Sequence, residues 1–385
     1  MIIFQVINNI AVDNKGGGAE LFVIRLLEQM HLKFDCHLII VWQYHTQKEI
    51  EIINKLHGKV NIHFLFEGKK KNTIGFFSIR RKFKALVRKY SPNIINSHSA
   101  LPDLLNASLS FLHTRKIHSV RTMHTDIHWI DSAIIEWLFI NLVFPIVFDK
   151  EIAISKATKK RLDNRMLTKL TKNNSDLIYN GISTDLFDLP YKRVGLSKHS
   201  DYKYTPLKIL SVGRLSHQKG YEYLLKAVKL IENEVNYKLL IVGDGPTYNS
   251  LITLSKNLGL ETSIEFLGFR NDVLEIMAKS HIFVSSSLWE GFPTVVLEAM
   301  AIGLPIIATN VSGSRELITD NKTGLLVPVR DPEAIAKAIV QLVSNPEFSE
   351  NLISNANEVV KKHTITKVAR KYAKVYRELV FNENN

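Results

Sequence analysis

The stretch HIFVSSSLWEGFPTVVLEAMAIGLPIIAT, residues 281–309, decides how the second half of this chain folds. It opens with the apolar run HIFVSSS, which predicts a strand, and continues through a loop that contains glycine and proline. A helix is predicted near 294–302, and PIIAT at 305–309 predicts a second strand. Strand, helix and strand joined by short loops indicate a βαβ unit, and therefore a parallel sheet.

The same alternation extends through the second half of the chain. Further strands are predicted for LKILSVG (207–213), YKLLIVG (237–243), IEFLG (264–268) and GLLVPV (324–329). Further helices are predicted near 221–231, 247–258 and 271–279. Because polar and apolar residues do not alternate in the apolar runs, we expect strands that are buried on both faces of a sheet.

The first half repeats this pattern less regularly. Its candidate strands are IIFQVIN, HLIIVW, NIHFLF, NIINSH, IHSVRTMH, EIAIS and SDLIYN. A chain of 385 residues is too long for one ordinary core, so the halves predict two doubly wound, Rossmann-like α/β domains. We expect a first domain over 1–190, an irregular linker over 191–206 and a second domain over 207–364. A C-terminal helix within 365–385 is expected to pack back on the first domain.

Composition limits the environment in which the protein works. The single cysteine, Cys36, excludes a disulfide framework and a cysteine-based zinc site, which favours a reducing compartment. The start of the chain lacks the pattern of a signal peptide and predicts a first strand instead. The apolar segment 129–148 contains two acids and Pro145, so we expect a buried or interfacial helix that breaks near this proline. These features together predict a cytoplasmic protein without a membrane span.

Positive charge is concentrated in the first half of the chain. Residues 1–200 hold 29 Lys and Arg against 17 Asp and Glu, whereas residues 201–385 hold 21 against 20. The densest segment, 69–90, has nine basic residues and no acid. Two interpretations remain open: a surface helix packed on a sheet, or a helix on an anionic membrane. Apolar residues recur in this segment at helical spacing, namely Phe76, Ile79, Phe83, Leu86, Val87 and Tyr90.

Ligands of open parallel sheets bind outside the carboxyl ends of the strands, so residues just after strands are the first candidates for a site. With two such domains facing each other, we expect the site in the cleft between them. In NKGGGAELFVIRLLEQM (14–30), glycines that include Gly17 and Gly18 separate a strand from a helix. Glycines there allow close approach to the backbone, and the helix N-terminus favours an anion. The alternative is a flexible loop, and the glycine spacing is not the dinucleotide fingerprint.

A second candidate follows the strand predicted at 207–213. In SVGRLSHQKG (211–220), Gly213 is followed by Arg214, and Lys219 lies five residues further on. Two cations at a strand end can hold a diphosphate, with arginine as a planar fork and lysine as a point charge. The alternative is a loop with two exposed charges.

The third candidate is the loop and helix start inside 281–309. Glu290 lies in the loop, and Glu298 lies in the first turns of the helix, whose free N–H groups can bind phosphate. A carboxylate can accept hydrogen bonds from both hydroxyls of a ribose or hexose diol. A helix-dipole effect would explain Glu298 weakly and Glu290 poorly. The turn and the first helical residues are Gly291, Phe292, Pro293, Thr294 and Val295.

These motifs resemble those of a known family. GGGAE, VGRLSHQKG, VGDGP, FLGF and EGFPTVVLEAMAIGLPII, in this order and spacing, are similar to glycosyltransferase family 4 over nearly the whole chain. That resemblance implies the GT-B architecture and a retaining transfer of a hexosyl or N-acetylhexosaminyl group from a nucleotide-sugar donor, with UDP the most frequent nucleotide of the family. Together with the basic first half and the segment 69–90, it predicts a glycan or lipid-linked acceptor in bacterial surface polysaccharide, lipopolysaccharide or oligosaccharide synthesis. It implies neither a metal nor another cofactor.

The resemblance also implies roles for individual residues. Glu298 would bind the donor ribose, and Glu290 would hold the donor sugar together with the backbone of the turn that follows it. Arg214 and Lys219 would neutralise the leaving diphosphate, and His124, in SVRTMHTD, would lie near the reactive face of the sugar. The other implied donor contacts are Gly17, Gly18, Gly213, Phe269 and Arg270 next to the base, Gly291, Phe292, Pro293, Thr294 and Val295.

Several interpretations of the function are compatible with these patterns. The basic first half suggests an acceptor at an anionic membrane surface, with the segment 69–90 in contact with the inner face of the cell membrane. Another GT-B enzyme, either a sugar-nucleotide epimerase or a glycoside phosphorylase, is an alternative. A non-enzymatic protein that binds a polyanion such as nucleic acid is a third interpretation, suggested by the basic composition. No helix-turn-helix, zinc-finger or RNP-like motif is present, so we expect no nucleic-acid partner. A nicotinamide dehydrogenase is disfavoured by the missing glycine fingerprint.

Overall fold

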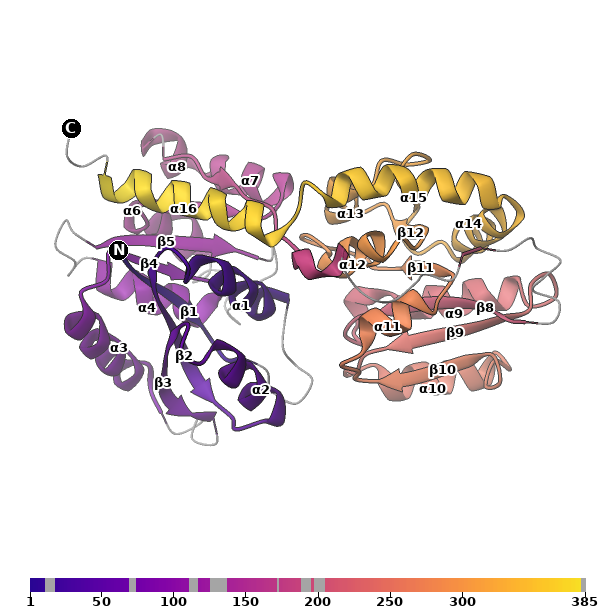
Figure 1. The fold of residues 1–385 in the computed structure, drawn as a ribbon, viewed down its shortest axis with the longest axis horizontal. Coiled ribbons are helices and arrows are strands. Elements are labelled where there is room, and N and C mark those ends of the chain that lie inside the picture. The colour runs from indigo at the N-terminus through magenta and orange to yellow at the C-terminus, as the bar shows by residue number, and fades with distance from the viewer. Residues whose placement is uncertain are drawn as a thin grey trace. The chain divides into compact units, whose positions relative to one another are not determined.

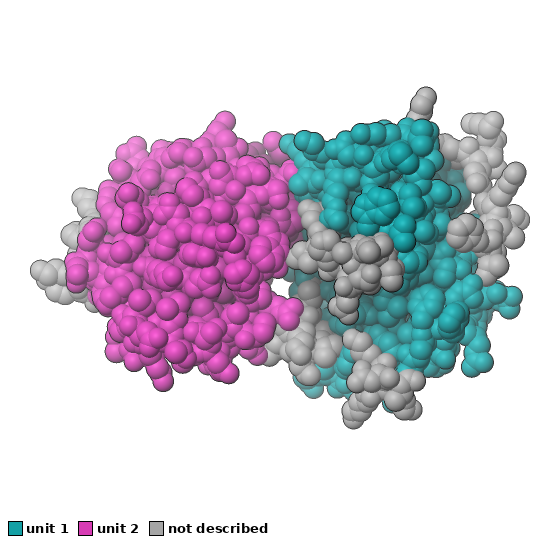
Figure 2. Space-filling view, turned by 180° about the vertical axis from the view of Figure 1, so that it is seen from behind, with its two compact units in different colours: residues 1–181, 365–385 teal, residues 182–364 magenta. Residues whose placement is uncertain are grey.

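The computed structural model describes residues 1–10, 18–68, 74–110, 117–124, 137–171, 173–187, 195–196 and 205–381. The chain divides into two compact units, residues 1–181 with 365–385 and residues 182–364 (Figure 2). Each unit has a parallel sheet with helices on both faces (Figure 1), so the predicted Rossmann-like α/β class is confirmed. Most of the predicted linker, 191–206, lies outside the described residues.

The sheet of unit 1 has seven strands in the order β3-β2-β1-β4-β5-β6-β7. All its recorded pairings are parallel, and β1 lies in the middle, where Ile3 pairs with both Cys36 and Ile94. Every residue of β1 after Ile2 is buried, as expected for a strand with helices on both faces. The strands confirm the seven predicted runs, with the bounds β1 Ile2–Ile7, β2 Asp35–Gln43, β3 Asn61–Glu67, β4 Ile94–Ser97, β5 His118–Met123, β6 Lys150–Ala153 and β7 Asp176–Leu177.

Helices cover the two faces of this sheet with separate cores. On one face, α1 packs against the C-terminal helix α16, and Phe22 and Tyr372 belong to the shared core. On the other face, α3 and α4 bury Phe83 and Leu105. The C-terminal helix therefore belongs to unit 1 (Figure 1). The helix bounds in this unit are α1 Gly18–Met30, α2 Gln47–Leu56, α3 Phe76–Tyr90, α4 Ala100–Ser110, α6 Phe144–Val147, α7 Lys156–Asp163, α8 Met166–Thr171 and α16 Ile365–Phe381.

The helix expected over 129–148 differs from its prediction. Residues 129–136 lie outside the described part, and the chain then forms a π-helix, η2 Phe139–Val143, that continues into α6. Pro145 lies in the first turn of α6, so the helix does not break at this residue. A proline has no N–H to donate, and a π-turn just before it changes the hydrogen-bond spacing so that the helix can continue. Among the described residues, no helix has the length and apolar character needed to cross a membrane.

The sheet of unit 2 has six parallel strands in the order β10-β9-β8-β11-β12-β13. They confirm the six predicted runs, with the bounds β8 Leu207–Val212, β9 Tyr237–Val242, β10 Ile264–Gly268, β11 Ile282–Ser285, β12 Ile306–Thr309 and β13 Leu325–Val327. The α-helices are α9 Tyr221–Leu230, α10 Tyr248–Asn257, α11 Val273–Ala278, α12 Thr294–Ile302, α13 Ser312–Leu317, α14 Pro332–Ser344 and α15 Pro346–Val360. Among the described residues of this unit there are also two 3-10 helices, η3 Thr184–Phe187 and η5 His217–Lys219.

A buried cluster of charges connects four elements of unit 1. Arg121 on β5 donates from Nε to Asp103 Oδ2 on α4 over 2.7 Å and from Nη1 to Glu151 Oε1 on β6 over 3.1 Å. Arg165, just before α8, also binds both carboxylate oxygens of Glu151. It further donates to the backbone oxygen of Ile140 over 2.9 Å and so anchors the π-helix. Glu151 therefore compensates two buried guanidinium groups at once.

Replacement of Glu151 should destabilise the protein strongly. Glu151→Ala leaves two buried arginines without their shared carboxylate, and we expect a loss of about 3–5 kcal/mol in the free energy of unfolding. The matched control is Asp176→Ala, which removes the partly exposed pair that Lys150 and Asp176 form over 3.2 Å on the adjacent strands. That change should cost at most about 1 kcal/mol. Urea unfolding of both variants measures the difference. An equal loss of unfolding free energy in the two variants would contradict the role of Glu151 as the shared partner of the two arginines.

Candidate functional site

The loops that follow β8 and β11 are joined by hydrogen bonds in unit 2. These two strands are neighbours in the sheet, so their carboxyl ends lie at the same edge. Leu288 N–H donates to Gln218 O over 2.7 Å, and the Gln218 side chain donates to Trp289 O over 3.0 Å. The Ser286 hydroxyl donates to Lys219 O over 2.9 Å. Hydrogen bonds therefore hold the loop that contains Lys219 against the loop that contains Glu290.

Two of the predicted site residues contact each other directly. Lys219 Nζ lies 2.5 Å from Glu290 Oε1, and the Ser287 hydroxyl donates to the same oxygen over 2.7 Å. Only 9% of Glu290 is exposed, and its backbone oxygen accepts hydrogen bonds from Gly313 N–H and the Ser312 hydroxyl. The carboxylate is therefore held from both its side chain and its backbone. Ser287 was not predicted, although its position directly after a strand was the available signal.

The start of α12 lies directly after this loop. Pro293 precedes the helix, and Thr294 and Val295 are its first two residues, half-buried, as the sequence predicted. Their N–H groups have no acceptor within the helix because they belong to its first turn. Glu298 follows on the next turn and is half-buried. The Phe292 side chain is buried, and its ring centroid lies 5.5 Å from that of His363.

The other predicted residues of unit 2 lie after β8 and β10. Arg214 is exposed. Phe269 is 37% exposed, and the neighbouring Arg270 forms two hydrogen bonds, of 2.8 and 2.6 Å, with the carboxylate of Asp272. Gly213 lies where backbones meet closely, since a Cβ at Gly243 would lie 2.0 Å from its carbonyl oxygen. The loops after β8 and β9 therefore tolerate no side chain at Gly243, whose φ is +137°.

Two further predicted site residues, Gly18 and His124, lie on or next to α1 in unit 1. Gly18 begins α1, whereas Gly17 lies outside the described residues. His124 follows β5, and its ring centroid lies 5.4 Å from that of Phe22, one helical turn after Gly18. Burial lowers the pKa of His124 to about 3, so its imidazole is neutral at physiological pH. Its Nε2 lies 3.0 Å from Nδ1 of His98, which directly follows β4 and was not among the predicted site residues.

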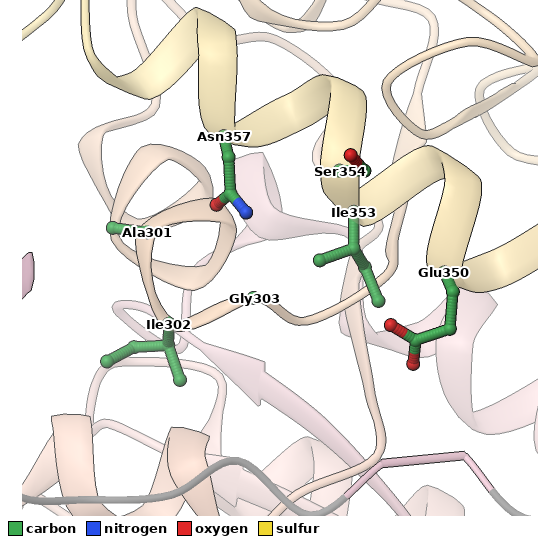
Figure 3. A pocket seen from close by; sticks show the side chains of 7 residues that line it. All are labelled: Ala301, Ile302, Gly303, Glu350, Ile353, Ser354 and Asn357. Atoms are coloured by element: carbon green, nitrogen blue, oxygen red, sulfur yellow. The ribbon is translucent and has the colours of Figure 1, made fainter.

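A cavity in unit 2 lies away from these residues. It has a volume of about 340 Å³ and opens between the C-terminal end of α12 and helix α15 (Figure 3). The end of α12 at Ile302 is about 12 Å along the helix from Thr294. No predicted site residue lines the cavity, so the loops at the strand ends remain the candidate site. The lining residues are Ala301, Ile302, Gly303, Glu350, Ile353, Ser354 and Asn357.

Comparison with known proteins gives matches over both units. The family described as Glycosyltransferase Family 4 matches residues 16–186, and the family described as Glycosyl transferases group 1 matches residues 197–359. An uncharacterised glycosyltransferase of Methanocaldococcus jannaschii is 33% identical over 232 residues, which span 59% of this chain and 59% of that protein.

Two longer matches cover nearly the whole chain. The N-acetylgalactosamine-N,N'-diacetylbacillosaminyl-diphospho-undecaprenol 4-alpha-N-acetylgalactosaminyltransferase of Campylobacter jejuni is 27% identical over 371 residues, 92% of this chain and 94% of that protein. Among solved structures, Anabaena HepE in complex with UDP and glucose superposes with a TM-score of 0.79. It is 19% identical and covers 97% of this chain and 99% of its own, so it shows that the fold is shared.

The junction of the two loops should depend on Gly220. This residue has φ +59°, and a Cβ there would lie 2.3 Å from Ser286 O. Gly220→Ala should therefore push the loop that carries Glu290 away from Lys219. The matched control is Gly259→Ala, because Gly259 has φ +68° and only the Lys229 Nζ atom lies near its Cβ position, at 4.0 Å.

Both variants place alanine in the left-handed region, at a cost of about 1–2 kcal/mol. Gly220→Ala should cost about 1–3 kcal/mol more, because the backbone must also shift. Chemical unfolding of the two variants measures this difference. If they lose the same stability, the close approach of the loops is not what requires glycine at position 220.

Proposed function

Because the chain belongs to glycosyltransferase family 4, we propose that it transfers a hexosyl or N-acetylhexosaminyl group from a UDP-sugar to a lipid-linked glycan, with retention of configuration at the anomeric carbon. The observation that carries this proposal is the contact between Lys219 and Glu290 beside the start of α12. Two similar proteins support it, since one structure is a complex with UDP and glucose and the other protein is named for a diphospho-undecaprenol substrate. The pathway would build a bacterial surface polysaccharide, lipopolysaccharide or lipid-linked oligosaccharide.

The donor diphosphate is assigned to the start of α12. The N–H groups of Thr294 and Val295 and the positive end of the helix dipole favour an anion there. Arg214 and Lys219, on the loop after β8, add positive charge at the same edge of the sheet. Glu298, one turn into the helix, is assigned to the ribose hydroxyls, because a carboxylate accepts two such hydrogen bonds.

Transfer breaks the bond between the anomeric carbon and the diphosphate oxygen, which leaves with the electron pair. The acceptor hydroxyl oxygen then bonds to the anomeric carbon on the same face of the sugar, and its proton passes to the departing diphosphate oxygen. Arg214 and Lys219 stabilise the negative charge that develops on the diphosphate, and they do so without a metal ion in this proposal. Glu290 is fixed by Lys219 and Ser287, and it orients the sugar through hydroxyl hydrogen bonds.

The donor assignment predicts stabilisation by one nucleoside diphosphate. UDP at about 100 times its Kd should raise the free energy of unfolding by about 2.7 kcal/mol, and GDP, ADP, NAD and phosphate should have smaller effects. Glu298→Ala should lose most of the UDP effect, and a chelator should leave it unchanged. Thermal unfolding measures these shifts. Glu333→Ala, in the first turn of α14, is the control. An equal UDP shift in Glu298→Ala would refute the assignment of Glu298.

The membrane surface is assigned to the outer side of unit 1. The apolar stripe of α3 packs in the core through Ile79, Phe83 and Val87, so the interpretation as a helix packed on the sheet is correct for that stripe. Residues 69–73 of the basic segment lie outside the described part. The outward side of α3 exposes Phe77, which is 81% accessible, and it carries basic residues without any acid.

Helices next to α3 continue this surface. Helix α3 contacts α4, α4 contacts α6, and α6 contacts α8. We propose that this layer rests on an anionic membrane, because basic side chains attract the lipid headgroups and apolar side chains enter the interface. The exposed apolar side chains next to or within η2, α6 and α8 are Trp137, Leu138, Ile146, Met166 and Leu170.

This assignment predicts lipid binding that depends on both charge and apolar side chains. The double variant Ile146→Ser with Leu170→Ser should bind vesicles containing phosphatidylglycerol about tenfold more weakly than the unaltered protein. Leu230→Ser is the control, since Leu230 is 53% exposed on α9 in unit 2. Flotation with and without the anionic lipid measures binding. Binding that is unaffected by lipid charge, or equal in the variants, would contradict this surface.

A further inference from the structure

A series of hydrogen-bonded, buried polar side chains connects the C-terminal helix α16 to the sheet of unit 1. The hydroxyl of Tyr376, on α16, is fully buried and accepts hydrogen bonds from Gln5 Nε2 over 3.0 Å and from Asn96 Nδ2 over 2.8 Å. Gln5 lies on β1 and Asn96 on the adjacent β4, both with no exposed surface. With its amide nitrogen bound to Tyr376, Gln5 directs its amide oxygen at the next group in this series.

That next group is His98. The Gln5 Oε1 atom lies 2.6 Å from His98 Nε2, and an amide oxygen can only accept a hydrogen bond. With the Gln5 amide in this orientation, His98 carries its proton on Nε2. Burial and the nearby His124 lower the pKa of His98 well below its ordinary value, so the ring is neutral. A neutral imidazole that is protonated on Nε2 has a lone pair on Nδ1.

The same reasoning determines the state of His124. Its Nε2 lies 3.0 Å from the unprotonated Nδ1 of His98, so His124 must donate and carry its proton on Nε2. Because burial keeps this ring neutral as well, its Nδ1 has a lone pair. That atom is buried and has no hydrogen-bond partner within the described part of the chain. A buried acceptor without a partner is unfavourable, and a ligand hydroxyl could supply the missing hydrogen bond.

We infer that Tyr376, Gln5 and His98 are positioning residues, which hold His124 as the Nε2–H tautomer and leave its Nδ1 to accept a hydrogen bond from a hydroxyl of the bound sugar. The part that concerns the sugar rests on the proposed function, whereas the tautomer follows from the contacts within unit 1. Without the hydrogen bonds from Tyr376 through Gln5 and His98, His124 would also adopt the Nδ1–H form. That form has a donor at the position where an acceptor is required.

The helix α16 offers a matched control for this inference. Tyr372 lies one turn before Tyr376, is equally buried, and contacts the Thr122 hydroxyl through its own hydroxyl over 3.3 Å. Thr122 donates to Asn96 and not to Gln5, so Tyr372 is not part of the hydrogen bonds that lead from Tyr376 through Gln5 to His98. Tyr376→Phe and Tyr372→Phe both remove one buried hydroxyl from the same helix. Only the first removes the acceptor that orients the Gln5 amide.

The test is the tautomeric state of the histidines in protein labelled with ¹⁵N-histidine. Two-bond correlation spectra distinguish protonated from unprotonated ring nitrogens, and His98→Gln and His124→Gln assign the signals. The unaltered protein and Tyr372→Phe should both show His124 protonated on Nε2 alone. Tyr376→Phe and Gln5→Met should show a mixture of tautomers at His124. The Nδ1–H form in the unaltered protein, or no change in either Tyr376→Phe or Gln5→Met, would overturn the inference.

The kcat of sugar transfer tests whether the tautomer of His124 matters for the reaction. Once a donor and an acceptor have been found, Tyr376→Phe should lower kcat by about fivefold, the usual effect of one hydrogen bond, and Tyr372→Phe should leave it nearly unchanged. An equal loss in both variants would show that this series of hydrogen bonds has only a structural role. The spectra need no substrate. If no nucleotide binds while the tautomers are as assigned, the proposed function fails and the assignment of the positioning residues remains.

Discussion

Burial of both faces of the parallel sheets is the constraint on which the rest of this structure depends. Helices cover β1 and β11 so completely that neither strand exposes a side chain beyond its first residue. Polar groups can therefore meet a ligand mainly where the strands end. Lys219, Glu290 and His124 all occupy such positions. The loops that carry Lys219 and Glu290 are held together by backbone contacts such as those at Gly220.

The polar residues inside the first sheet are the exceptions to this rule. Gln5, Asn96 and Thr122 lie on three adjacent strands, and each would be unfavourable in the core without a partner. The two buried tyrosines of α16 supply these partners, so the return of the C-terminal helix both covers an apolar face and satisfies a polar network. A network of this kind requires a specific arrangement of its members, because a group left unpaired is more costly than an apolar one.

The sequence predicted the strands well because each is an apolar run of limited length, bounded by turn residues. It also selected Lys219 and Glu290 as candidates from their positions after strands, and His124 only through the family resemblance; the structure places all three after strands, and their roles stay predictions. It did not predict that Lys219 binds Glu290, or that Gln5 binds Tyr376, 371 residues further along the chain. Hydrogen bonds between distant residues have no local pattern.

Other features were ambiguous for physical reasons. A helix that packs on a sheet and a helix that lies on a membrane have the same apolar period, so the stripe of α3 could be interpreted only once the covered side was known. The expected break at Pro145 failed for a related reason. The π-helix before it is held by Arg165, which donates to Ile140 O and is itself fixed by Glu151. A tertiary contact thus decides a local conformation.

The two units place different chemistry at their strand ends. Unit 2 presents a lysine, an exposed arginine and the start of a helix, all of which favour a group with several negative charges. Unit 1 presents an imidazole that burial keeps neutral, and its Nδ1 has no hydrogen-bond partner among the described residues. A neutral acceptor distinguishes a hydroxyl from a phosphate, because it attracts the first and offers nothing to the second. A nucleotide sugar, the donor in the proposed function, contains both kinds of group.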